Sequence, residues 1–135
     1  AEGYGGGTSE VRLAASCGRV AEVLSASAPR PVIATKFLPT IWRYTRASFM
    51  ASLDESLRRL GTPAIDLYFI HSPVHPLPIE RWVGYACDAV EAGKVREIGL
   101  SNCNADEVRR AVGVARAGPL HRSQSDHVQF AHLRQ

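Results

Sequence analysis

The chain has 135 residues, of which 45% are hydrophobic and 21% charged, with a formal net charge of +3. This length is enough for one domain with a buried core, and this composition excludes an intrinsically disordered chain. The modest positive charge falls on amphipathic segments, so we expect no nucleic-acid partner. No apolar run approaches the roughly 18 residues of a membrane-spanning helix, so we expect no membrane partner. The first residues also lack a secretory-signal pattern.

The number and spacing of the cysteines indicate whether the chain is in a reducing or an oxidising compartment. Cys17, Cys87 and Cys103 are odd in number and irregularly spaced. This pattern is typical of reduced thiols and not of a disulfide framework or a zinc site. We therefore expect a reducing compartment and no metal.

The first stretch, AEGYGGGTSE, leads into a predicted helix from Ser9 to about Ala26. A glycine-rich turn before a helix can bind an anion. However, the stretch lacks the lysine of a P-loop and the third glycine of the dinucleotide fingerprint. Three interpretations stay open: a weak anion site, a flexible loop, and a loop whose glycines present Tyr4.

Short apolar runs then alternate with amphipathic segments. Strands are predicted over residues 31–37, 65–71, 95–100 and, more weakly, 127–130. Helices are predicted over residues 47–60 and 79–92, and in a further segment that Asn104 and Glu107 begin with capping-box spacing.

Within the predicted helix over 47–60, acidic residues stand four positions before basic ones. Asp54 precedes Arg58 and Glu55 precedes Arg59 at this interval. Oppositely charged residues at this spacing stabilise a helix, so we expect two ion pairs.

Alternating strands and helices predict βαβ units and a parallel sheet. The intervals between successive strand ends are 32, 35, 30 and 26 residues, measured at Tyr4, Lys36, His71, Ser101 and His127. The carboxyl ends of parallel strands share one edge, so these five residues are expected to converge. The spacing alone allows either a TIM barrel or a doubly wound sheet.

Lysine is rare in this chain, which has fourteen arginines and only Lys36 and Lys94. Lys36 stands inside an apolar strand. A lysine ammonium is a compact charge that can lie close to another titratable group, so its position there invites a chemical interpretation, with chance as the alternative.

Tyr4, Lys36 and His71 form a coherent set for acid catalysis. A carbonyl reduced by hydride transfer needs a proton donor, but an ordinary phenol has a pKa near 10. An ammonium ~4 Å away contributes about 4 kcal/mol at an effective dielectric of 20, which lowers the phenol pKa by at most about three units before desolvation is counted. A neutral histidine can orient the carbonyl.

Several motifs together carry a family resemblance: AEGYGGGTSE, VIATKF, SLRRLGTPAIDLYFIHSP, VEAGKVREIGLSN and the VQF near the end. In this order and spacing they resemble the central portion of the aldo-keto reductase family. The stretch IWRYTRASFMASLDESLRRLGT is most similar to bacterial and plastid-type members. The resemblance implies a (β/α)8 TIM barrel that reduces carbonyls with NADPH, in the cytoplasm or the plastid stroma.

The resemblance also implies roles for individual residues. Tyr4 matches the proton donor, Lys36 the residue that tunes it, and His71 the residue that orients the carbonyl. The family's fourth catalytic residue is an aspartate two positions before the AE of its motif, which is upstream of Ala1.

Three further residues match cofactor-binding positions. Ser101 and Asn102 of GLSN correspond to the residues that hold the nicotinamide carboxamide. His127 stands where the family has a glutamine, so the resemblance implies that the glutamine contact to the carboxamide is either lost or replaced by an imidazole. The expected cofactor is NADPH, with NADH as the alternative.

A complete barrel takes about 250 residues. We therefore expect residues 1–135 to form a single aldo-keto reductase-like domain that is incomplete at both ends and covers about the end of strand 2 through strand 6. The predicted activity is NADPH-dependent reduction of a small aldehyde or ketone to an alcohol. The alternatives are a non-catalytic or regulatory nicotinamide-binding protein, as in the potassium-channel β subunits that resemble this family, and an inactive fragment.

Overall fold

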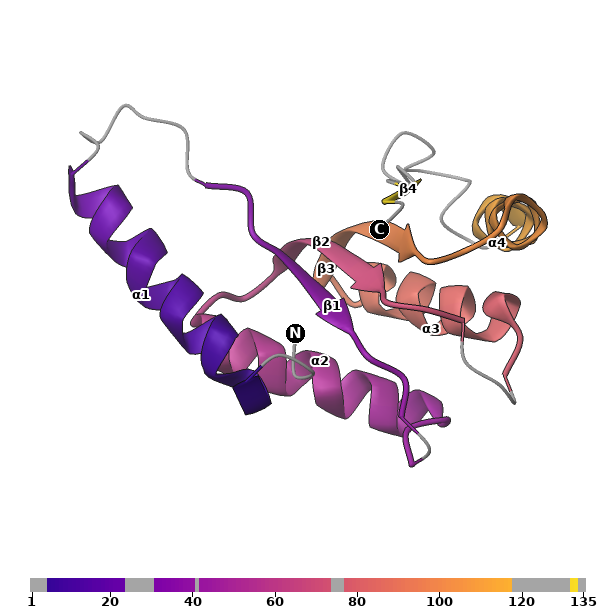
Figure 1. The fold of residues 1–135 in the computed structure, drawn as a ribbon, viewed down its shortest axis with the longest axis horizontal. Helices are drawn as coiled ribbons and strands as arrows, with labels where there is room; N and C mark the ends of the chain where they lie inside the picture. The colour runs from indigo at the N-terminus through magenta and orange to yellow at the C-terminus, as the bar shows by residue number, and fades with distance from the viewer. Residues whose placement is uncertain (1–4, 24–30, 41, 74–76, 118–131, 134–135) are drawn as a thin grey trace.

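The computed structural model describes residues 5–23, 31–40, 42–73, 77–117 and 132–133 (Figure 1). Its sheet has the order β1-β2-β3-β4, and every pair is parallel. The strands are β1 (Ala34–Phe37), β2 (Ile65–Ile70), β3 (Val95–Ser101) and β4 (His132–Leu133). The helices are α1 (Thr8–Val23), α2 (Arg46–Leu60), α3 (Ile79–Glu91) and α4 (Ala105–Ala117), and a short 3-10 helix, η1 (Gly5–Gly7), precedes α1.

The predicted parallel arrangement is confirmed. β1 begins three residues later than the sequence suggested, whereas β2 and β3 match their predicted ranges to within one residue. The predicted strand over 127–130 lies outside the described residues, and β4 pairs with β3 just beyond it. Since side chains alternate along a strand, the short β1 still presents residues to both faces of the sheet.

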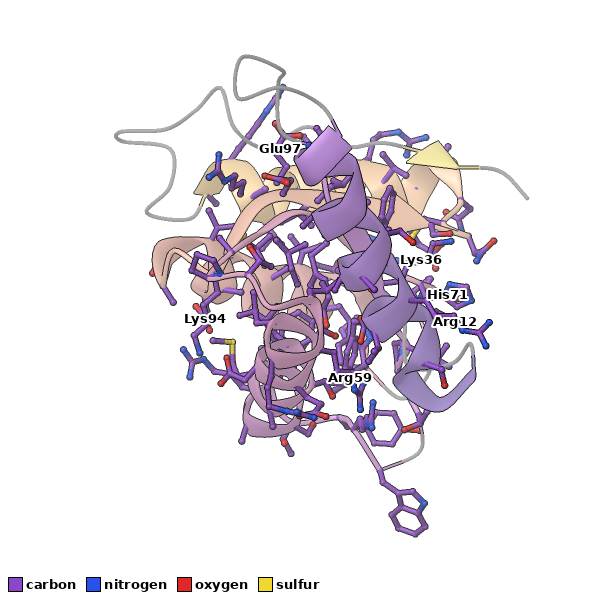
Figure 2. All side chains as sticks on the ribbon, turned by 90° about the vertical axis from the view of Figure 1, so that its left-hand side faces the viewer. Arg12, Lys36, Arg59, His71, Lys94 and Glu97 are labelled. Carbon is purple, nitrogen blue, oxygen red and sulfur yellow. The ribbon has the colours of Figure 1, made fainter. Side chains whose placement is uncertain are left out.

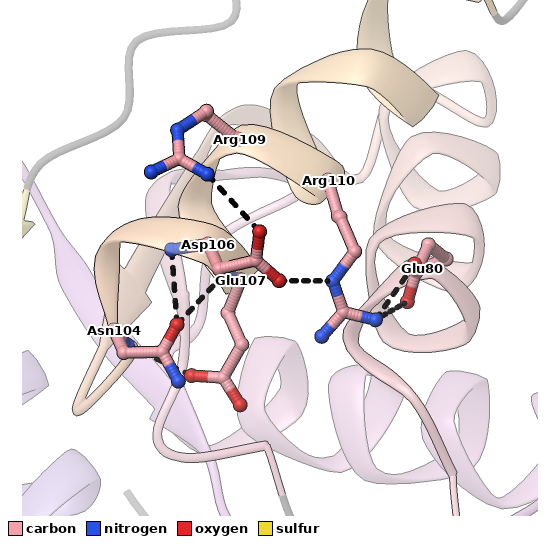
Figure 3. A network of polar contacts seen from close by, with 6 residues as sticks. All are labelled: Glu80, Asn104, Asp106, Glu107, Arg109 and Arg110. Carbon is pink, nitrogen blue, oxygen red and sulfur yellow. Dashed lines mark hydrogen bonds and ion pairs between the residues drawn. The ribbon is translucent and has the colours of Figure 1, made fainter.

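The helix boundaries follow from local chemistry. At the start of α2, Thr45 Oγ1 accepts a hydrogen bond from the Ser48 amide, and Ser48 Oγ accepts one from the Thr45 amide. The helix ends at Gly61, whose φ of +63° is left-handed and suits glycine. The capping box predicted for α4 is also present, because Asn104 and Glu107 each accept a hydrogen bond from the other's amide (Figure 3).

The ion pairs on α2 differ from the expectation. Glu55 pairs with Arg59 at i,i+4, as predicted, and also with Arg58 at i,i+3. Asp54 instead pairs with Lys94, just before β3, at 2.5 Å. A tertiary partner therefore takes the carboxylate that helical spacing had assigned to Arg58, and the second lysine of the chain has a structural contact.

The hydrophobic core lies between the sheet and the helices α2 and α3, which run along the same side of it (Figure 1). Aromatic rings dominate its centre. The Phe49 ring centroid is 4.7 Å from that of Phe37 and 5.8 Å from that of Tyr68, and the Trp82 centroid is 5.5 Å from that of Phe37. Aromatic pairs at these distances add to the stability that burial provides.

Charged residues join α3 to α4 on the surface. Arg110 lies 3.0 Å from Glu80 on α3 and 3.2 Å from Asp106 on its own helix (Figure 3). All three side chains are at least partly exposed to solvent, so these ion pairs add little stability. Among the described residues, no helix is long and apolar enough to cross a membrane, and no cluster of His, Cys, Asp or Glu could hold a metal ion.

Candidate active site

The site is assembled where the strands end. Lys36 is the penultimate residue of β1, His71 directly follows β2, and Ser101 ends β3. Phe37 and Leu100 belong to the core beneath the sheet, so their neighbours Lys36 and Ser101 point to the opposite face. Figure 2 shows the Lys36 and His71 side chains at the same edge of the molecule.

Lys36 is the first of three residues that lie side by side on this face. It pairs with Phe69 on β2, which pairs in turn with Gly99 on β3. The Lys36 ammonium lies 5.9 Å from the centroid of the Phe69 ring, within the range of a cation–π contact. A Cβ at Gly99 would lie 2.4 Å from the same ring. Gly99 therefore leaves the space that Phe69 occupies beside Lys36.

His71 has the electrostatic environment of a neutral imidazole. Burial lowers the pKa of His71 below its ordinary value, and the positive charge of Lys36 lowers it further. Both effects disfavour the protonated ring. The two side chains are thus close enough for one to affect the other, and His71 is neutral at neutral pH.

Asn102 fixes the end of β2. Its φ of +56° is left-handed, a conformation that asparagine tolerates better than most residues. Its side-chain Nδ2 donates a hydrogen bond of 2.8 Å to the His71 carbonyl. The His71 amide donates in turn to the Phe37 carbonyl at 3.0 Å. His71 is therefore held by its backbone between the ends of β1 and β3.

Ser101 has an unused hydroxyl. The residue is fully buried, and its Oγ has no hydrogen-bond partner within the part of the chain that the structure describes. A buried hydroxyl without a partner is costly, so a ligand atom at this position would be favoured. Burial raises the pKa of the nearby Cys103 thiol to about 11, with a smaller contribution from Glu107. The thiol is therefore protonated at neutral pH and a poor nucleophile.

The structure thus brings together four of the six residues predicted from the sequence: Lys36, His71, Ser101 and Asn102. Tyr4 and His127 lie outside the described residues. Phe69 and Gly99 were missed. Two-residue alternation places Phe69 on the same face as His71, but only the sheet register reveals that Gly99 and Lys36 are its neighbours.

A comparison with family models gives a match to the Aldo/keto reductase family over residues 1–130. The chain belongs to this family. The similarity of the chain to individual family members agrees with this assignment. An aldo-keto reductase of Schizosaccharomyces pombe, yakc, whose name includes NADP(+), is 51% identical over 63 residues, covering 47% of this chain and 18% of that protein.

Two further members extend the match. Human aflatoxin B1 aldehyde reductase member 4 is 36% identical over 106 residues, covering 78% of this chain and 31% of its own. The crystal structure of an aldo-keto reductase from Klebsiella pneumoniae in complex with NADPH has a TM-score of 0.69 at 25% identity, covering 85% of this chain and 37% of that one. The chain thus spans less than a third of the length of the two curated relatives. Its fold is part of the family's (β/α)8 barrel.

Proposed function

We propose that the chain is the acid–base part of an NADPH-dependent reductase that converts an aldehyde or ketone to an alcohol. Membership of the aldo/keto reductase family supports an oxidoreductase. The observation that carries the proposal is the placement of Lys36 and His71 on one face of the sheet, at the ends of the adjacent strands β1 and β2.

The proposed roles follow from these groups. The Tyr4 hydroxyl donates a proton to the oxygen of the substrate carbonyl, and the Lys36 ammonium lowers the phenol pKa by stabilising the phenolate. The neutral His71 donates a hydrogen bond to the same carbonyl oxygen, which orients the substrate and stabilises the negative charge that develops there. A protonated imidazole beside Lys36 would be disfavoured, so the two residues have distinct tasks.

The residues around Ser101 fit a nicotinamide. The carboxamide of this ring has both hydrogen-bond donors and an acceptor, and the unpartnered, buried Ser101 hydroxyl offers a match. Asn102, held in its left-handed conformation beside His71, and His127 are the further proposed contacts. When bound, NADPH supplies the hydride. The similar Klebsiella pneumoniae structure is a complex with NADPH, and the name of the Schizosaccharomyces pombe relative includes NADP(+).

The decisive experiment is substitution of the proton donor in the full-length protein. Tyr4→Phe is expected to lower turnover of a small aldehyde by about 10²- to 10⁴-fold, the usual contribution of general acid catalysis. Lys36→Arg should also reduce turnover strongly, since the planar guanidinium does not replace a compact ammonium. NADPH oxidation, followed by absorbance, measures both effects, and binding is followed by nicotinamide fluorescence.

Near-normal turnover in Tyr4→Phe would end the assignment of Tyr4 as proton donor. NADPH binding without turnover across a broad panel of carbonyls would favour a regulatory nicotinamide-binding protein instead. Turnover and NADPH binding are measured on the same preparations, so together they distinguish a catalytic reductase from a regulatory nicotinamide-binding protein.

A further inference from the structure

A buried polar cluster joins three elements near the first turn of α1. Glu10 is only 1% exposed. Its carboxylate accepts a hydrogen bond of 2.7 Å from the Thr35 hydroxyl on β1 and forms an ion pair of 3.3 Å with the Arg59 guanidinium on α2. Because each partner belongs to a different element, Glu10 fixes the start of α1 against both β1 and α2.

Arg59 also packs against the turn that precedes α1. Gly7 has a φ of +89°, and a Cβ at this position would lie 2.6 Å from Cζ of Arg59. The guanidinium therefore fills the space that a side chain at Gly7 would need. An ion pair of 3.0 Å with Glu55, one turn earlier on α2, holds the guanidinium in place. Figure 2 shows Arg59 beside α1.

The cluster is connected through the chain to two of the proposed catalytic residues. Thr35 directly precedes Lys36, and the two side chains point to opposite faces of β1. Gly7 comes three residues after Tyr4, a distance of at most about 10 Å along an extended backbone. The contacts of Glu10 and Arg59 thus restrain both the turn that follows Tyr4 and the strand that carries Lys36.

We propose that Glu10 and Arg59 are positioning residues for the proton transfer, because they fix the turn at Gly7 and the strand that carries Lys36. This inference rests on the proposed function, in which Tyr4 donates the proton. Neither residue needs to touch the substrate, since both act through the Gly7 turn and through Thr35.

Energetics favour positioning over simple stabilisation. Desolvation offsets most of the attraction within a buried ion pair, so such a pair contributes little net stability. Its directional contacts nevertheless define one arrangement of the groups it joins. A displacement of about 1 Å between reacting groups can cost about a hundredfold in rate. A cluster of this kind is therefore suited to setting the positions of segments that carry reacting groups.

The first test compares variants of the full-length protein. Glu10→Gln keeps the size of the side chain and removes its charge, and Arg59→Lys keeps the charge and removes the fork that packs on Gly7. We expect kcat to fall about tenfold or more in both, because general acid catalysis depends on geometry. The dissociation constant of NADPH, measured by nicotinamide fluorescence, should change less than about twofold, because neither residue is a proposed cofactor contact.

Arg58→Lys is the matched control. Arg58 is adjacent on the same helix and also pairs with Glu55, but it is 71% exposed and on the surface. Its substitution should leave kcat unchanged. Thermal unfolding of all variants shows whether each remains folded. If Arg59→Lys does not fold, the closely isosteric Glu10→Gln decides the question.

The second test detects a defect in proton donation specifically. An electron-poor aldehyde such as 4-nitrobenzaldehyde forms a less basic alkoxide than 4-methoxybenzaldehyde, so its reduction depends less on the proton donor. The loss of kcat in Glu10→Gln should therefore be greater with the methoxy compound. A general structural defect would reduce both rates by the same factor.

Equal losses with the two aldehydes, or unchanged kcat in Glu10→Gln, would overturn the positioning role. Loss of turnover in Tyr4→Phe alongside unchanged kcat in Glu10→Gln would reject this inference and leave the proposed function intact. Normal turnover in Tyr4→Phe would reject the proposed function itself.

Discussion

The two faces of the sheet differ in what their side chains do. The face covered by α2 and α3 is apolar and closely packed, with Phe37, Tyr68 and Leu100 each 1% exposed. The opposite face carries Lys36 and Ser101 at the carboxyl ends of the strands. Adjacent residues of one strand thus serve stability and chemistry separately, because their side chains alternate.

This division explains how an ammonium can occupy an apolar strand. Phe37 anchors β1 through its ring contacts with Phe49 and Trp82, so the strand is held without any contribution from Lys36. On the opposite face, the Lys36 ammonium lies over the Phe69 ring. We therefore expect substitutions in the apolar core of the helix-covered face chiefly to reduce stability, and substitutions on the opposite face to reduce activity.

The largest effect on stability is expected from Phe49→Ala. Phe49 is fully buried, and its ring contacts those of Phe37, Tyr68 and Tyr85. Truncation removes these contacts and leaves a cavity, which should lower the free energy of unfolding by about 3 to 5 kcal/mol. Urea denaturation measures the change. Met50→Ala, on the same helix but only half-buried, should cost clearly less, and equal losses in the two variants would contradict this account.

A smaller effect is expected from Gly99→Ala on the opposite face. The added methyl group would meet the Phe69 ring, which must move or force the strands apart. Overpacking of this kind costs about 1 to 3 kcal/mol. Because Phe69 lies beside Lys36, turnover should fall although Gly99 is not a catalytic residue. Gly113→Ala, on α4 with open space around it, is the control and should reduce neither quantity.

Unchanged turnover in Gly99→Ala would show that Phe69 does not help to place Lys36. A loss of stability without any loss of turnover would show that Gly99 contributes to stability alone, like the residues of the helix-covered face. Either result would remove the distinction between the two faces at this position.

The smallest effect concerns the titration of His71. Its pKa is lowered in the folded protein, first by burial and then by Lys36, so its midpoint should lie below the ordinary value of 6.5. Lys36→Met should raise the midpoint only part of the way, because burial remains. NMR of the imidazole in the folded and urea-unfolded protein measures both values. A His71 midpoint that does not change in Lys36→Met would show that the charge of Lys36 has no effect on the His71 imidazole.

Protonation of His71 also changes the stability of the folded state with pH. The unfolded chain takes up a proton at His71 as the pH falls through about 6.5, and the folded chain does so only at lower pH. His71 therefore makes the folded state less stable as the pH falls through this range. Above the unfolded pKa both states are neutral at this residue, and the contribution disappears.

Local rules predicted the elements well. Apolar runs located β2 and β3, capping chemistry located the start of α4 at Asn104, and Gly61 ended α2. These features depend on residues a few positions apart. Asp54 shows where such rules fail, since the spacing assigned it to Arg58 and the fold placed Lys94 beside it. Contacts between distant segments depend on packing that no local pattern encodes.

The sequence by itself determined the βα order, the family resemblance, and the choice of a tyrosine, a lysine and a histidine for the proposed chemistry. Only the tertiary structure showed that Phe69 lies between Lys36 and Gly99, and that Glu10 joins Thr35 to Arg59. The reason is physical. Strand alternation and helix caps are set by neighbouring residues, whereas the contacts of Glu10 reach across 25 and 49 positions of the chain and form only when the sheet and helices pack.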